Sequence, residues 1–166
     1  GKIAYSFHSG TSATTTSGVE KKEDATSVSL GYKAGSVDAT LAYETYGADT
    51  ATTGKRDATR AALSYKMTPE LRLVGFYQSA NSKTGNTDQG GDVTGLGLEY
   101  MVTPKTALKA HYMDLKANAA NSDAKMYTVG AEYRYNKELR FYANYAGLDN
   151  GSAIKLTPWK EGRTAA

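Results

Sequence analysis

Residues 132–145 read EYRYNKELRFYANY, and residues 99–112 read EYMVTPKTALKAHY. In both stretches apolar and polar residues alternate, a short break containing Asn or Pro follows, and the alternation then resumes. Alternation with period two is typical of a β-strand that has one apolar face. Pro and Asn are residues that tight turns favour. Each stretch therefore predicts a β-hairpin with one apolar side.

The same unit occurs twice more, as GYKAGSVDATLAYETY (31–46) and SYKMTPELRLVGFY (64–77). In each unit one tyrosine precedes the turn, and a second tyrosine after the turn lies eleven or twelve residues beyond the first. At ~3.4 Å per residue and a strand tilt near 45°, the second tyrosine rises roughly 15–20 Å above the turn, comparable to the apolar band of a membrane barrel. Tyrosine is favoured where water meets lipid. The repeat predicts an aromatic girdle at the lipid interfaces, formed by Tyr32, Tyr43, Tyr65, Tyr77, Tyr100, Tyr112, Tyr133 and Tyr145.

Alternation continues from Ile3 to Tyr145 and gives about nine strands and no convincing helix. Short turns fall at 35–36, 68–70, 103–105 and 136–138, and long polar connections fall at about 10–25, 47–57, 80–92, 116–125 and 147–165. Short connections at one end and long ones at the other indicate an up-and-down meander, with the short turns periplasmic in bacterial membrane barrels. The predicted fold is all-β, an antiparallel up-and-down transmembrane β-barrel.

A soluble β-meander or sandwich is the alternative reading of the tyrosine repeat, because tyrosine suits strands in general. A soluble barrel lines its interior with apolar residues and turns polar ones to water. Here the face opposite the Leu and Tyr row is charged and small, and no second apolar set is available to cover that row. An apolar sheet face needs helices, another sheet or lipid against it. The pattern favours lipid.

The stretches YTVGAEYRYNKELRFYANYAGLDN (127–150) and LGLEYMVTPKTALKAHYMDL (96–115) resemble the general porins of Gram-negative bacteria, especially the C-terminal half of their barrel. As a pattern, the resemblance covers nearly the whole chain. It implies a large single-chain barrel in the bacterial outer membrane, commonly of sixteen strands and commonly a homotrimer. Such a barrel contacts the lipid bilayer and lipopolysaccharide, and it passes small hydrophilic solutes and ions without a cofactor.

Two features depart from that family. Porins usually end in a strand that closes on a C-terminal aromatic residue, whereas this sequence ends in KEGRTAA after a stretch from 147 that reads as a long outer loop. About nine strands also fall short of the even number that such barrels have. Residues 1–166 are therefore expected to form a single barrel segment, incomplete at both ends. In members of this family the loop that narrows the lumen usually lies in the N-terminal half of the chain, so no constriction loop is assigned here.

The polar face of the predicted strands is expected to line the pore. Its charged residues are Lys33, Arg60, Lys66, Arg72, Lys109, Arg134, Arg140, Glu44, Glu99 and Glu132, with Lys2 and Asp38 beside them. Basic side chains outnumber acidic ones, which concentrates anions in confined water and predicts a weak anion preference. The alternative is that these charges only solvate the lumen or pair across neighbouring strands.

Signals for catalysis and metal binding are weak, and no enzyme is expected. The two histidines, His8 and His111, fall on the polar face without a Ser/Asp partner at a recognisable spacing. Glu99 and Glu132 lie on separate strands, with no reason to act as an acid/base pair. The run GNTDQGGD (85–92) offers oxygen ligands for Ca²⁺, but it lacks EF-hand spacing and reads as a flexible loop, so no metal site is assigned. The chain has no Cys, and its net charge of +3 is too mild to predict nucleic acid as a partner.

Three functional classes remain. The first is a diffusion porin. The second is a small structural or adhesive outer-membrane barrel whose loops bind partners, and the third is a soluble β-meander or a barrel enzyme. The predicted interior includes the small residues Ser27, Ser29, Gly31, Gly95, Gly97 and Gly130. Small residues fill a narrow barrel poorly, which favours the wide, water-filled barrel of a porin.

Overall fold

The computed structural model describes residues 2–12, 21–47, 53–84 and 87–156, with side chains for 25–47, 55–82 and 88–156. The described residues form ten strands and no helix that is long and apolar enough to cross a membrane. The strands are β1 (Lys2–Ser12), β2 (Lys21–Ala34), β3 (Val37–Tyr46), β4 (Thr53–Lys66), β5 (Leu71–Thr84), β6 (Thr87–Asp88), β7 (Gly91–Thr103), β8 (Thr106–Ala117), β9 (Ala124–Arg134) and β10 (Arg140–Asn150).

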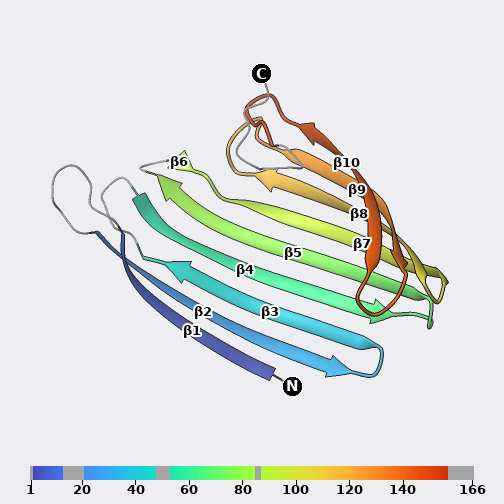
Figure 1. The fold of residues 1–166 in the computed structure, drawn as a ribbon. Helices are drawn as coiled ribbons and strands as arrows, with labels where there is room; N and C mark the ends of the chain where they lie inside the picture. Colours follow the sequence, from blue (N-terminus) through green and yellow to red (C-terminus); the bar gives the residue numbers. More distant parts are fainter. Residues whose placement is uncertain (1, 13–20, 48–52, 85–86, 157–166) are drawn as a thin grey trace.

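All ten strands belong to one antiparallel sheet whose order follows the chain, β1-β2-β3-β4-β5-β7-β8-β9-β10, and the two-residue β6 pairs only with β5. Figure 1 shows them as one curved layer in which each long strand lies beside the strands that precede and follow it. The nine-strand path among the described residues confirms the predicted all-β, up-and-down meander. Within this part of the chain the sheet does not close on itself, since β1 and β10 each have one pairing partner.

Three of the short turns are built the same way. The Oγ1 of Thr68 accepts the N–H groups of residues 70 and 71 at 3.2 and 3.0 Å, and the Oγ1 of Thr103 accepts those of residues 105 and 106 at 3.2 and 3.0 Å. Asn136 Oδ1 accepts the N–H groups of residues 138 and 139 at 2.9 and 2.7 Å. Short polar side chains that bond their own backbone define such turns. The fourth turn uses Gly35 at φ +55°, a conformation that glycine adopts without steric cost.

At the opposite end the strands are longer than the sequence predicts. Residues 53–57 and 80–84 were expected in polar loops, yet they belong to β4 and β5. Across this pair Asn81 Nδ2 donates to Asp57 Oδ2 at 3.1 Å. A hydrogen-bonded ladder needs no apolar face, so strands can continue past the apolar band, and apolar alternation underestimates their length.

The two faces of the sheet differ in exposure. Along β7 the exposed side chains include Leu96 at 67 %, Leu98 at 42 % and Tyr100 at 47 %, while the intervening Gly97 and Glu99 are half-buried and Gly95 is buried. Side chains on the concave side of a curved sheet converge and shield one another, so the Leu and Tyr face is convex. Among the described residues the only buried apolar side chains are three alanines, and nothing covers the convex face. An apolar, uncovered face on a sheet whose inner strands are paired on both sides is the arrangement that suits lipid.

Candidate functional site: the inner wall

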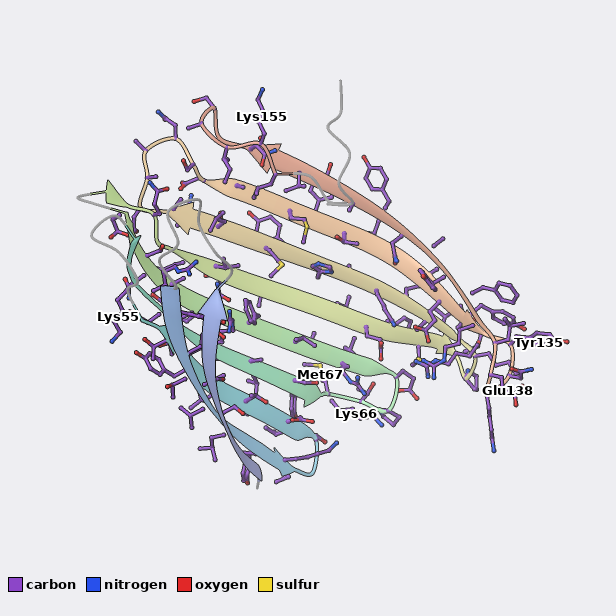
Figure 2. All side chains as sticks on the ribbon, turned by 60° about the vertical axis from the view of Figure 1, so that its left-hand side comes forward. Lys55, Lys66, Met67, Tyr135, Glu138 and Lys155 are labelled. Carbon is purple, nitrogen blue, oxygen red and sulfur yellow. The ribbon has the colours of Figure 1, made fainter. Side chains whose placement is uncertain are left out.

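The concave face of the sheet is called the inner wall here, and the strand register defines it. Glu44, Arg60, Gln78, Glu99 and Glu132 belong to this face. The register places all ten predicted pore-lining residues on it, while their role in a pore stays a prediction. Figure 2 shows Lys66 at the end of β4 that leads into a short turn, and Lys55 near the other end of the same strand.

A row of ion pairs crosses five strands of the inner wall, β5, β7, β8, β9 and β10. Lys109 on β8 lies between two carboxylates, with its Nζ 3.5 Å from Glu99 and 2.6 Å from Glu132. Arg134 Nε donates to Glu132 at 2.6 Å, and Arg140 NH1 lies 3.9 Å from the same carboxylate. At the other end, Arg72 NH1 lies 3.8 Å from Glu99. This charge row has four cations and two carboxylates, so pairing neutralises only part of it.

A second cluster lies on the N-terminal side of the wall. Arg60 donates from NH2 to Glu44 at 2.7 Å and from Nε to Gln78 at 2.6 Å. Arg60, Ala58 and Arg56 are successive inner-wall positions of β4. Arg56 lies over the ring of Tyr46, with its Cζ 5.6 Å from the ring centroid. Sequence reasoning missed Arg56, because it fell within the expected loop 47–57. The sequence indicates its strand only through the alternation in DATRAALSYK, the ten residues that follow Arg56.

An apolar trough interrupts the polar surface of the inner wall. Its floor is the backbone of β7 at Gly95 and Gly97, since glycine has no side chain to cover it. Phe76 and Met113 face each other across Gly95, and Val74 and His111 face each other across Gly97. The hollow measures about 370 Å³, and Arg72, Glu99 and Lys109 close its end toward the short turns.

The apolar surface continues beyond the trough. A second hollow of about 280 Å³ is lined by Val93, Met113, Leu115, Ala124, Lys125, Met126, Leu148 and Leu156. The inner wall is therefore less uniformly polar than the alternation suggests. The signal in the sequence is the run LRLVGFY, where Val74 and Phe76 occupy positions that strict alternation reserves for polar residues.

A third hollow lies at the short-turn end of the wall. It measures about 310 Å³ and is lined by Lys66, Pro69, Glu70, Leu71, Arg72, Glu99, Met101 and Arg134. This basic pocket contains three cations and two carboxylates. Arg72 and Glu99 line both the basic pocket and the trough, so the two hollows meet at these side chains.

The convex face carries the eight predicted girdle tyrosines, and all eight are exposed. Tyr127, which the prediction omitted, lies on the same face opposite Tyr112, and its ring is 6.3 Å from that of Tyr145. The same ring covers Gly147 on β10, where a side chain would collide with it. The placement of these tyrosines agrees with the repeat, and their contact with lipid stays a prediction.

The remaining sequence candidates are the two histidines and the stretch 85–92. His111 forms part of the trough wall, and the side chain of His8 lies outside the described residues. Among the described residues no cluster of His, Cys, Asp and Glu could hold a metal ion. Within the stretch 85–92, Asp88 Oδ1 accepts the N–H of Gly90 at 2.8 Å, so this carboxylate shapes a turn.

The connection between β8 and β9 is ordered by one carboxylate. Asp123 accepts hydrogen bonds from Lys116 Nζ at 2.9 Å and from the N–H of Ala117 at 3.0 Å. These bonds, the Lys116 bond above all, lower the pKa of Asp123 below its ordinary value. Its carbonyl also accepts the N–H of Gly151 at 2.7 Å, which ties this connection to the one after β10.

A model of Gram-negative porins matches residues 1–153. The chain belongs to the Gram-negative porin family. As a member of this porin family it is a protein of the bacterial outer membrane. No curated protein sequence matches the chain at a significant level.

Solved structures show the same fold. A porin refined at 1.8 Å resolution is 18 % identical to this porin, with a TM-score of 0.71, and the match covers 90 % of this chain and 53 % of that one. OmpT with loop L8 deleted, an outer membrane protein of Vibrio cholerae, is 18 % identical with a TM-score of 0.66, covering 79 % of this chain and 50 % of that one. In-vitro folded OmpT in its trimer form is 19 % identical to this chain with a TM-score of 0.63, and the match covers 78 % of this chain and 46 % of that one. The chain thus spans about half the length of the structures that it matches.

Proposed function

We propose that the chain forms part of a water-filled outer-membrane channel for the passive diffusion of small hydrophilic solutes and ions, with a weak anion preference. One observation carries the proposal: a single sheet has an uncovered apolar convex face and a charged inner wall. Lipid is the solvent that suits the first face, and confined water suits the second. No catalytic step is part of this function.

The charges of the inner wall support the anion preference. The described side chains on this face include eight cations: Lys33, Arg56, Arg60, Lys66, Arg72, Lys109, Arg134 and Arg140. Among the described side chains of this face, four are carboxylates, and Asp38, Glu44, Glu99 and Glu132 each lie within ion-pair distance of a cation. Cations therefore remain in excess after pairing, and in a confined aqueous space they raise the local concentration of anions.

The assembly around this segment is also a proposal. The structural relatives are about twice as long as the matched part of this chain, which supports a full barrel of about sixteen strands, of which residues 1–166 form one segment. One relative is described in a trimer form, which supports a homotrimer here. In that assembly the convex tyrosines form the girdle at the lipid and lipopolysaccharide boundaries, and the inner wall lines the pore.

Planar bilayers test the proposal. The full-length protein is reconstituted, single-channel conductance is recorded, and the reversal potential is measured across a KCl gradient. We expect stepwise conductance and a reversal potential whose sign reports chloride permeating more readily than potassium. Absence of conductance would refute the channel, and clear potassium selectivity would refute the anion preference while leaving the channel intact.

A further inference from the structure

We propose that the inner wall binds amphipathic organic anions, with their apolar body in the trough formed by Val74, Phe76, Gly95, Gly97, His111 and Met113 and their anionic group at Arg72. This inference rests on the proposed channel and adds a substrate class to it. A wall that only solvates ions has no use for an apolar hollow beside its charge row. The hollow, at about 370 Å³, falls within the range of small-molecule sites.

The shape of the trough selects a flat apolar group. Its walls stand on β5 and β8, two strand spacings or about 10 Å apart, with β7 between them. Gly95 and Gly97 leave the floor as bare backbone, so a planar ring can lie against the peptide groups between Phe76 and Met113. Aromatic and aliphatic side chains on both sides supply the contact that such a ring favours.

The charges around the trough select an anion. Arg72 is one inner-wall position from Val74, or about 7 Å along β5. Its ion pair with Glu99 is long, at 3.8 Å, and half of its side chain is exposed. The guanidinium therefore has donors available for a carboxylate. Lys109, also at this end of the trough, carries a second positive charge.

The basic pocket extends the same track toward the short turns. It meets the trough at Arg72 and Glu99, and Lys66 and Arg134 add positive charge beyond that junction. An anion bound at Arg72 thus lies next to two further cations, Lys66 and Arg134, on the side of the short turns. The apolar trough followed by the basic pocket suits a solute with one apolar and one anionic end, and a solute with a cationic end would meet repulsion.

The test uses the full-length channel in planar bilayers, with 3-phenylpropionate as the probe. Propionate lacks the ring, and 3-phenylpropylammonium replaces the anion with a cation, so each isolates one part of the proposed recognition. We expect 3-phenylpropionate to reduce the KCl current saturably, and the other two to require at least about tenfold higher concentrations. Equal potency of the three compounds, or no saturable block by 3-phenylpropionate, would overturn the inference. Loss of the KCl current in the unmodified protein would instead refute the proposed channel.

Variants locate the site. In Gly95→Ala/Gly97→Ala the new methyl groups meet Phe76 and Val74 Cβ at 3.4 and 3.5 Å, which is ordinary contact, so the floor fills without disturbing the strands. We expect this variant and Arg72→Gln each to weaken the block by 3-phenylpropionate about fivefold or more. The matched control is Gly75→Ala, on the convex face of β5, where the added methyl group has open space. Block that is the same in the double variant and in the control would place the site elsewhere.

A cysteine reports whether the trough is open in the full channel. The sequence has no Cys, so Gly97→Cys introduces one thiol into this segment. We expect a negatively charged thiosulfonate added to the bath to react with it, and 3-phenylpropionate to slow that reaction. A thiol that stays unreactive from both sides of the membrane would mean that another part of the polypeptide covers the trough, and the proposal would fail.

Discussion

At the scale of single residues, Glu132 is the carboxylate of the charge row that lies near three cations, Lys109, Arg134 and Arg140. Its carboxylate accepts hydrogen bonds from Lys109 and Arg134 at 2.6 Å each, and 13 % of its side chain is exposed. A charge-assisted pair in such a shielded place is stronger than a surface pair. Glu132 thus holds two cations in fixed positions and offsets part of their field.

Glu132→Gln should increase the anion preference of the channel. The substitution keeps an acceptor for one cation and removes one negative charge beside Lys109 and Arg134. A unit charge about 7 Å from a passing ion in water is worth about 0.6 kcal/mol, or roughly a threefold change in local ion concentration. Reversal potentials in a KCl gradient measure the effect. The control Glu138→Gln removes the same charge from an exposed turn and should leave the ratio nearly unchanged; an equal shift in both variants would contradict the role of Glu132.

At the scale of strands, an arginine introduced on the convex face should cost more stability than one introduced on the inner wall. Leu63 lies on the convex face of β4 between girdle tyrosines, and Ala62 beside it lies on the inner wall. Leu63→Arg puts a cation into hydrocarbon and should destabilise the folded barrel by about 2–4 kcal/mol. Ala62→Arg should cost less than about 1 kcal/mol, because its side chain meets water. Urea unfolding in lipid vesicles compares the two, and equal losses would show that the convex face does not meet lipid.

The connection between β8 and β9 should loosen in acid. Lys116 and the N–H of Ala117 hold the pKa of Asp123 below its ordinary value, so the folded loop favours the carboxylate. A lowered pKa contributes stability that is complete above the ordinary aspartate pKa of about 4 and is lost as the pH falls through the lowered value.

Hydrogen exchange of the Ala117 amide checks this dependence at matched pH. Asp123→Asn keeps an acceptor oxygen for that amide but loses the ion pair, so the unmodified protein should be better protected at pH 7. The difference should shrink as the pH falls below the ordinary aspartate pKa of about 4. Asp149→Asn, which removes a carboxylate from β10, serves as the control. If the difference in protection between Asp123→Asn and the unmodified protein persists in acid, the charge of Asp123 has no part in ordering the loop.

Most of the strand pattern was predictable, because alternation and turn chemistry are local properties. Tyr100 and Tyr112 mark a hairpin in the sequence, and Thr103 and Pro104 mark its turn. Strand length was less predictable, since polar residues such as Asp57 and Asn81 pair as well in a ladder as in a loop. The charge row and the trough were not predictable. Both depend on which residues of adjacent strands are opposite each other, and register is set across tens of residues.

At the scale of the whole molecule, the proposed anion preference should depend on salt concentration. The cations of the inner wall are spread over β2 to β10, and in the proposed water-filled channel mobile ions screen them. The screening length falls from about 10 Å at 0.1 M to about 3 Å at 1 M. The chloride-to-potassium permeability ratio should therefore approach one as the KCl concentration rises, as reversal potentials at constant gradient would show. A ratio independent of salt would indicate that selectivity arises from a narrow steric contact.

The order of the strands has a consequence for how such a protein diversifies. Each long strand contacts only its chain neighbours, and each hairpin carries its own turn signal and its own tyrosines. Duplicating or deleting one hairpin leaves every other pairing unchanged and alters only the circumference. Genetic gain or loss of whole two-strand units is thus a route to wider or narrower relatives, with no need to redesign the residues that remain.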